Sequence, residues 1–193
     1  DKQSLNTDAK RAIAERALAA VEDHDRIYLD GGSTVLMLAR LLEAREDLTV
    51  VTNSLMAAEA LMASRHRLIL VGGAFRPLSR TLVGPLTASV INSIHVDKAF
   101  MGTIGFTAED GMTTTSPDEA FTKECLMRRA DRIFLLADST KLGVPSFARS
   151  GTVKDIDVLI TDAVDSDFRS EVEALGLEVQ VAGRQTADAV DSV

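Results

Sequence analysis

Glycines and hydroxyl side chains stand together in the segment Asp30-Gly31-Gly32-Ser33-Thr34, between a short apolar run and a helical pattern. The glycines let backbone amides turn toward a ligand, and the N-terminus of a following helix adds a partial positive charge. This chemistry suits an anion such as a phosphate. The spacing matches neither a dinucleotide-binding loop nor a P-loop. A tight turn capped by Ser33 or Thr34 explains the same residues equally well.

A second hydrogen-bonding loop, Thr52-Asn53-Ser54, also precedes a helical pattern. A plain N-cap by Asn53 or Ser54 is the commoner use of such residues. When two such loops follow neighbouring strands, however, their helix N-termini can converge on one anion. The pair of loops therefore favours an anion site.

Flexible and basic residues follow in two later loops. Gly73, Arg76 and Arg80 lie in one of them, and Gly102 lies in the other. Arginine offers bidentate donors to an anion, although a solvated loop arginine is commoner. These loops add candidate contacts without defining a site by themselves.

Two more sets of charged residues are candidates for the same ligand. Glu119 and Lys123 are four residues apart on a helical pattern, where a surface salt bridge is the usual outcome. Asp138 and Lys141 follow a buried apolar run. A lysine in that position can bind a phosphate, although most loop lysines are simply solvated.

No residues are spaced to hold a metal ion. His24, His66 and His95 are far apart and have no Cys or His neighbours at ligand spacing. Cys125 is the only cysteine, so no internal disulfide is possible, and we expect it to pack as a small apolar residue. We assign no metal, no cofactor and no catalytic residue.

Short apolar runs alternate with helical patterns, and these elements must position the loops. The apolar runs predict strands at 27–29, 49–52, 68–71, 98–101, 133–137, 158–161 and 178–181. The helical patterns cover 7–21, 34–42, 55–63, 86–93, 118–130 and 167–175. This alternation predicts an α/β fold, a doubly wound, mostly parallel sheet with helices on both faces. Ligands bind such sheets beyond the carboxyl ends of the strands.

The length of 193 residues fits one domain, for which we expect residues 1–184, with a loose C-terminal tail at 185–193. No apolar run is long enough for a membrane span and no signal-peptide pattern is present, so we expect a cytoplasmic protein with no membrane partner. The net charge of −8 argues against DNA binding by this chain itself, because contact with the phosphate backbone needs a basic surface.

In their order, these loops resemble the C-terminal sensor domain of DeoR-family transcriptional regulators. The matching segments are YLDGGST at 28–34, LTVVTNS at 48–54, LVGG at 70–73, VGP at 83–85, DKAFMG at 97–102, GMTT at 111–114, ADSTK at 137–141 and IDVLITD at 156–162. Each motif is weak alone, whereas all of them in one order are specific.

The resemblance implies an effector-binding domain that senses a phosphorylated sugar or a related intermediate and forms a homo-oligomer, either a dimer or a tetramer. It implies a regulator, most often a repressor of a carbohydrate catabolic operon. Family members contact DNA through an N-terminal winged helix-turn-helix domain. That domain is absent from this sequence, and we expect it to precede residue 1.

The residues and the resemblance together suggest how an effector is held. The phosphate would lie on the glycine and hydroxyl loops, with Lys141 and Arg76 balancing its charge, while acidic side chains and Lys123 would contact the sugar hydroxyls. The predicted effector-binding residues are Asp30, Gly31, Gly32, Ser33, Thr34, Thr52, Asn53, Ser54, Gly73, Arg76, Gly102, Glu119, Lys123, Asp138 and Lys141.

The alternative is an enzyme that acts on sugar phosphates, because the same fold family includes ribose-5-phosphate isomerase and coenzyme A transferases. That isomerase has an Asp-Gly-Ala-Asp segment whose acids serve in its active site, whereas this chain has Met101-Gly102-Thr103-Ile104. Proton transfer between sugar carbons needs a positioned base. Glu124 alone does not replace the missing acids, so we predict that the chain is not an enzyme.

Overall fold

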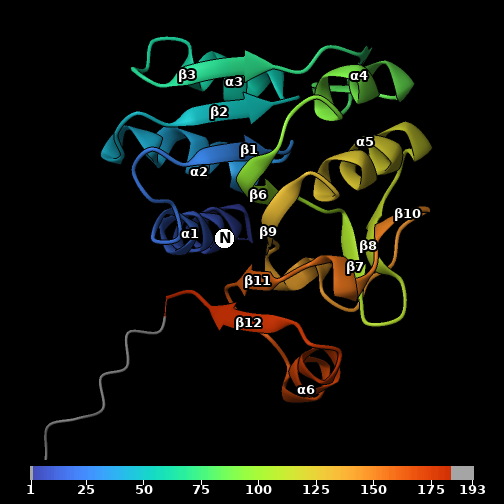
Figure 1. Ribbon diagram of the computed structural model, residues 1–193. Coiled ribbons are helices and arrows are strands. Elements are labelled where there is room, and N and C mark those ends of the chain that lie inside the picture. Colours follow the sequence, from blue (N-terminus) through green and yellow to red (C-terminus); the bar gives the residue numbers. More distant parts are fainter. Residues whose placement is uncertain (1, 184–193) are drawn as a thin grey trace, which may run out of the picture.

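The centre of the molecule is a parallel β-sheet, seen in a computed structural model that describes residues 2–183. Seven strands follow the order β12-β11-β9-β6-β1-β2-β3, and all neighbouring strands are parallel (Figure 1). The strands are β1 (Arg26–Leu29), β2 (Thr49–Thr52), β3 (Arg67–Leu70), β6 (Val96–Met101), β9 (Ala130–Leu136), β11 (Val158–Thr161) and β12 (Glu178–Val181). The predicted α/β class and the mostly parallel sheet are confirmed.

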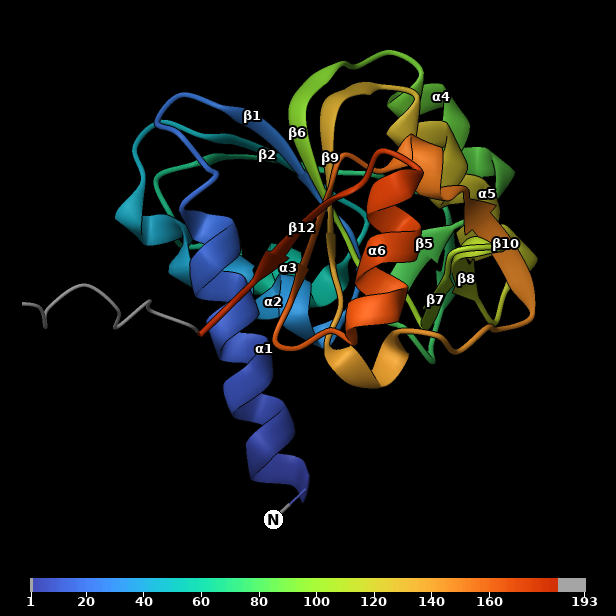
Figure 2. The same ribbon diagram turned by 90° about the horizontal axis from the view of Figure 1, so that it is seen from below.

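Helices cover both faces of this sheet, as predicted (Figure 2). They are α1 (Lys2–Leu18), α2 (Ser33–Leu41), α3 (Leu55–Leu61), α4 (Ala88–Ile91), α5 (Pro117–Met127) and α6 (Ser166–Ala174), with short 3₁₀ turns η1 (Leu42–Ala44), η2 (Pro85–Thr87), η3 (Ser139–Lys141) and η4 (Val153–Asp155). No helix in the described part of the chain is both long enough and apolar enough to span a bilayer.

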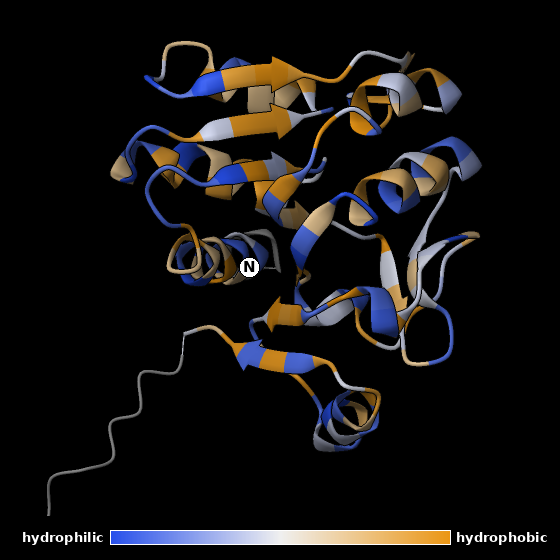
Figure 3. Ribbon diagram, viewed as in Figure 1, coloured by the Kyte–Doolittle hydropathy of each residue, from blue (hydrophilic) through white to orange (hydrophobic). Residues whose placement is uncertain are grey.

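The alternation of side chains along each strand divides the hydrophobic core in two. Ile27 of β1 packs with Leu38 of α2 on one face, whereas the next residue, Tyr28, packs in the core that contains Leu126 of α5 and Val172 of α6. In Figure 3 strands β2, β3 and β11 are largely orange, the edge strand β12 alternates between blue and orange, and the helices carry both colours, as expected for buried strands, a half-exposed edge strand and amphipathic helices.

Two predicted helices differ clearly from the observed ones. The first helix runs from Lys2 to Leu18, so it begins five residues before the predicted start at residue 7. The helix predicted at 86–93 is divided into η2 and α4, because Pro85 opens the segment with a tight 3₁₀ turn. Gly176, with φ 96°, follows the C-cap of the last helix and favours its end there. The predicted tail at 185–193 lies outside the described residues.

Two small antiparallel sheets were not predicted. Strands β4 (Ala74–Arg76) and β5 (Thr81–Val83) form a hairpin. Strands β7 (Gly105–Thr107), β8 (Gly111–Thr114) and β10 (Ala148–Gly151) form a second sheet, which lies with α5 beyond the arrowheads of β1 and β2 in Figure 1. Their runs of three or four residues contain glycine and polar residues, so their sequences lack the apolar alternation that marks a strand.

Candidate functional site

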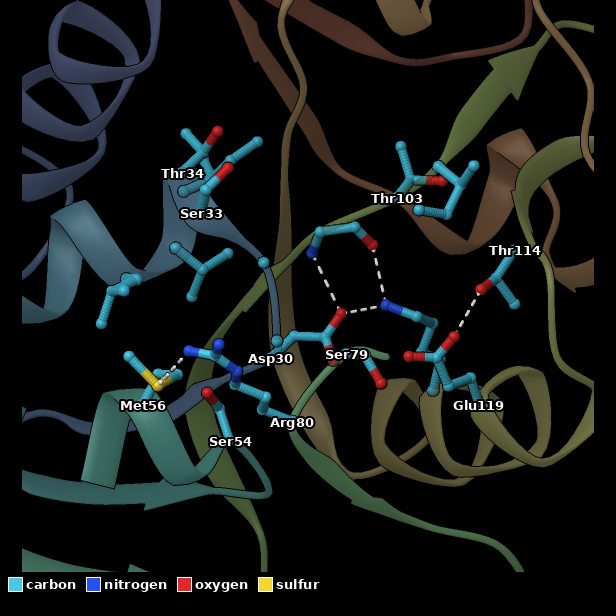
Figure 4. Close-up of a pocket in the computed structure, with 18 of the residues that line it drawn as sticks. Asp30, Ser33, Thr34, Ser54, Met56, Ser79, Arg80, Thr103, Thr114 and Glu119 are labelled. Carbon is cyan, nitrogen blue, oxygen red and sulfur yellow. Dashed lines mark hydrogen bonds and ion pairs between the residues drawn. The ribbon is translucent and has the colours of Figure 1, made fainter. Parts of the chain in front are cut away.

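A cleft of about 400 Å³ opens at the carboxyl ends of the central strands, a size suited to a small metabolite. Its walls come from the loop after β1, the β4–β5 hairpin, the turn after β6 and helix α5. Figure 4 shows the side chains that line it. The predicted residues that it brings together are Asp30, Gly31, Gly32, Ser33, Thr34, Ser54, Arg76, Gly102, Glu119, Lys123 and Lys141.

The N-terminus of α2 faces this cleft without a side-chain cap. Its N-cap residue, Gly32, has φ 122°, a conformation that favours glycine. The amides of the first helical turn have no partners within the helix. The hydroxyl of Thr34 is buried and has no hydrogen-bond partner among residues 2–183. The cleft therefore presents unused hydrogen-bond donors where the helix dipole favours an anion.

A buried ion pair forms the floor of the cleft. The ammonium group of Lys123 on α5 contacts the carboxylate of Asp30 and donates a 2.9 Å hydrogen bond to the carbonyl of Gly102. The amide of Gly102 donates to the same Asp30 carboxylate at 3.0 Å (Figure 4). This triangle ties α5 to the ends of β1 and β6. Its charges balance each other, and both contacts use the same carboxylate oxygen of Asp30.

A second ion pair crosses the opposite wall. The Arg76 guanidinium lies 3.5 Å from the Glu119 carboxylate and donates a 2.8 Å hydrogen bond to the Thr115 hydroxyl. Glu119 in turn accepts a 2.8 Å hydrogen bond from Thr114 of β8. These contacts join the β4–β5 hairpin, α5 and the small sheet at the wall of the cleft.

Lys141 follows β9 and contributes a charge without an ion-pair partner among the described residues. Burial lowers the pKa of this lysine, the charge of Asp138 raises it, and the charges of Lys10 and Lys123 lower it further. A bound anion would relieve both the burial cost and the repulsion. Lys141 is therefore suited to contact a negatively charged group.

The lining of the cleft is positively charged although the chain is acidic. Four basic and two acidic side chains face the cleft, and each acidic one is paired with a basic one. Two positive charges are left over. The six residues are Arg76, Arg80, Lys123, Lys141, Asp30 and Glu119.

Four predicted site residues lie outside the lining of the cleft and have structural contacts. The Thr52 hydroxyl donates to the Leu29 carbonyl at 2.7 Å, and the Asn53 side-chain amide donates to the Leu82 carbonyl at 3.0 Å. Gly73 packs so closely on the next hairpin strand that a β-carbon would lie 2.9 Å from the Val83 carbonyl oxygen. Asp138 caps η3 by accepting from the Thr140 amide at 3.1 Å.

Several lining residues were missing from the predicted site. Ser79 and Arg80 come from the hairpin, Thr103 follows β6, Thr114 ends β8, and Thr115 follows it. The GMTT segment at 111–114 contains Thr114, but nothing in the sequence indicates that β8 folds back toward the first strand. Arg80 was considered as a possible anion contact but was not among the predicted effector-binding residues. These residues reach the cleft through the small sheets, which the sequence did not reveal.

We expect Gly31→Ala to destabilise the fold by about 1–3 kcal/mol, as overpacking of a tight contact does. A β-carbon there would lie 2.5 Å from the Thr81 methyl group, so the hairpin would have to move. Gly72→Ala is the control, because a β-carbon at Gly72 meets nothing within 4 Å and the change should stay within about 0.5 kcal/mol. Urea denaturation measures both changes, and equal effects would contradict the close packing at Gly31.

A match to a family model shows which protein family this chain belongs to. A model of the DeoR C-terminal sensor domain matches residues 5–163, most of the chain. This chain belongs to that family. The DeoR sensor domain is thus identified by its sequence as well as by the arrangement of its loops.

Similar proteins are transcriptional regulators. The HTH-type transcriptional regulator GlpR of Haloferax volcanii is 35% identical over 179 residues, which cover 92% of this chain and 70% of that protein. The lactose phosphotransferase system repressor of Streptococcus mutans is 32% identical over 170 residues, 86% of this chain and 67% of that protein. The chain is therefore the sensor domain of a DeoR-type regulator and not an enzyme.

Among solved structures, a ribose 5-phosphate isomerase of Methanocaldococcus jannaschii is similar in fold. Its TM-score is 0.53 at 20% identity, and the match covers 71% of this chain and 55% of the isomerase. This likeness confirms the predicted fold relationship and says nothing about activity.

Within the described residues, no three His, Cys, Asp or Glu side chains are grouped so that they could hold a metal ion.

Proposed function

We propose that the effector of this DeoR sensor domain is a small phosphorylated sugar, bound in the cleft at the carboxyl ends of the strands. The observation that carries this proposal is the uncapped N-terminus of α2, where the buried Thr34 hydroxyl has no partner. A buried polar group without a partner costs free energy, which a ligand that accepts its hydrogen bond recovers.

The charges of the cleft support a phosphate. Lys141 and Arg80 have no carboxylate partners among residues 2–183, and together they match a group with two negative charges. A phosphate monoester carries between about 1.5 and 2 negative charges at pH 7. A free sugar would leave both cations and the first-turn amides of α2 without a partner.

The remaining polar side chains suit sugar hydroxyls. Asp30 and Glu119 keep acceptor capacity beyond their present hydrogen bonds, because a carboxylate has about four lone-pair sites. Both residues lie within the cleft and are held rigidly by Lys123 and Arg76. Rigid acceptors of this kind distinguish one arrangement of hydroxyls from another.

The relatives suggest the wider role. GlpR and the lactose phosphotransferase system repressor are each longer than the matched region. We propose that the complete protein, like an HTH-type regulator, binds DNA through a helix-turn-helix domain that precedes this one. We also propose that it acts as a homo-oligomeric repressor of sugar genes, and that the effector changes its affinity for the operator.

Calorimetry with matched pairs of ligands tests the effector proposal. The panel is glucose 6-phosphate, fructose 1-phosphate, fructose 6-phosphate, ribose 5-phosphate and glycerol 3-phosphate, each titrated beside its unphosphorylated parent. We expect at least one phosphate to bind with micromolar affinity and its parent to bind at least about 100-fold more weakly, because several charge-assisted hydrogen bonds are lost. Equal affinities for a sugar and its phosphate would refute the proposal.

The variant Thr34→Val adds a test of the anion site itself. It should weaken the sugar phosphate by about 10- to 100-fold, the effect of one hydrogen bond to a charged group, and should not lower the melting temperature of the free domain. The matched control is Thr52→Val. The Thr52 hydroxyl donates a hydrogen bond to the Leu29 carbonyl, so Thr52→Val should lower the stability of the domain. The Thr52→Val domain should still prefer the phosphate over the free sugar to the same extent as the wild type.

A further inference from the structure

We propose that Arg80, at the tip of the β4–β5 hairpin, is an effector-binding residue that makes the site select a terminal phosphate monoester over a singly charged anion. This inference rests on the proposed function, since it concerns the same cleft. In this proposal the preference for one kind of anion comes from the Arg80 side chain and not from the glycine loop at residues 30–34.

The backbone at Arg80 is held in a conformation that a non-glycine residue adopts at a cost. Its φ is 53°, in the left-handed region. Hydrogen bonds fix the peptide there: the Leu55 amide donates to the Arg80 carbonyl at 3.1 Å, and the Leu82 amide donates to the Asn53 carbonyl at 2.8 Å. Such strain persists only where surrounding contacts impose it, and it directs the side chain over the cleft.

The same contacts place Arg80 beside the glycine loop. Its neighbour Thr81 is packed against Gly31, where a β-carbon would lie 2.5 Å from the Thr81 methyl group. Thr81 also bridges to Ser54 at the start of α3 and bonds to the Ser79 hydroxyl at 2.8 Å. Arg80 therefore flanks the segment whose amides and hydroxyls form the anion site.

Most hydrogen-bond donors of the Arg80 guanidinium have no partner among the described residues. Its only hydrogen bond within the described residues is to the sulfur of Met56 at 3.4 Å (Figure 4), and a thioether is a weak acceptor. No carboxylate of residues 2–183 lies within ion-pair distance of it, in contrast to Arg76, which Glu119 neutralises. Arg80 lines the cleft, which also holds hydroxyls and the N-terminus of α2.

A planar guanidinium binds two oxygens of one phosphate at once. A terminal monoester offers three such oxygens and about two negative charges, so it can be shared between the α2 N-terminus and Arg80. A diester has one charge and only two free oxygens. Arg80 therefore favours the monoester, and without Arg80 the site would retain a general affinity for anions with little preference between the two.

Titrations with methyl phosphate and dimethyl phosphate, followed by NMR at pH 8, test this selection. The wild-type domain should bind methyl phosphate about tenfold more tightly than dimethyl phosphate. Arg80→Ala should weaken methyl phosphate about tenfold and remove most of the preference, and Arg80→Lys should recover less than half of the loss on a logarithmic scale, because lysine lacks the fork. Arg65→Ala, an exposed arginine outside the cleft, should change neither constant.

Arg80→Gly separates binding from folding. Glycine accepts the left-handed backbone without strain, so this variant should melt no lower than the wild type and should still lose the preference for the monoester. Wild-type affinity for methyl phosphate in Arg80→Ala, or an unchanged preference in either variant, would overturn the role of Arg80 and leave the effector proposal standing. Absence of phosphate binding by the wild-type domain would overturn both.

Discussion

Lys123→Met is expected to lower the free energy of unfolding by about 3–5 kcal/mol, because it leaves the Asp30 carboxylate buried without its counter-charge. Both side chains of the pair are almost fully buried, with exposed fractions of 9% for Lys123 and 4% for Asp30. Methionine fills similar space, so the loss comes from charge rather than from a cavity. In a domain of this size the melting temperature should fall by about 6–20 °C, which calorimetry measures.

The double variant Asp30→Asn/Lys123→Met distinguishes the effect of the charges from the effect of side-chain packing. Asparagine still accepts the Gly102 amide and carries no charge, so the double variant should recover most of the stability lost by Lys123→Met. The control on the same helix is Arg128→Met, which removes an exposed ion pair to Glu124 and should cost less than about 1 kcal/mol. A double variant as unstable as the single one would show that the side chains matter for packing alone.

This ion pair also fixes the loops that form the floor of the cleft. Lys123 joins helix α5 to the loops after β1 and β6, and Asp30 begins the glycine loop that leads into α2. A preorganised site loses less conformational entropy on binding. The residues that hold the floor of the cleft are therefore tied to the affinity for the effector, whether or not they touch it.

The sequence alone predicts the parallel sheet well, because its strands are buried on both faces and appear as short apolar runs. Segments such as 49–52 and 158–161 have the predicted boundaries. It also singles out the Asp30–Thr34 loop, because glycines and hydroxyl residues before a helix suit an anion site, although a capped tight turn explains the same residues equally well. Residues 30, 31, 32, 33 and 34 all line the cleft.

What the sequence does not show is the contribution of the small antiparallel sheets. The hairpin β4–β5 brings Arg76 and Arg80 to the cleft, and β8 brings Thr114. Their strands are short and their pairing depends on contacts between distant segments, which leave no periodic pattern. Conversely, Asn53 looks like a ligand residue by type but uses its side-chain amide to hold the hairpin at Leu82. Residue type shows hydrogen-bonding capacity, and only the fold shows where it is used.

Lys141→Met is expected to weaken a sugar phosphate by about 10- to 100-fold, the usual value of a charge-assisted hydrogen bond. The same substitution should not destabilise the free domain, because burial of an ammonium group without a paired acid disfavours its charged form. A residue that lowers the stability of the free domain but strengthens ligand binding is typical of a functional position. Wild-type affinity in this variant, measured by calorimetry, would exclude a contact between Lys141 and the phosphate.

The affinity of the wild-type domain should also fall as the pH rises, and the direction follows from the lowered pKa of Lys141. Only the ammonium form of Lys141 attracts the phosphate, so binding raises the pKa of Lys141. The affinity for the phosphate is highest at a pH below the pKa that Lys141 has in the free domain. The affinity falls as the pH rises from that value toward the higher pKa that Lys141 has in the complex, so the loss begins below pH 10.5, the ordinary pKa of lysine. Lys141→Arg keeps its charge throughout and should show a flat profile between pH 7 and about pH 9.5. If both proteins lost affinity in parallel, the pH dependence would belong to another group.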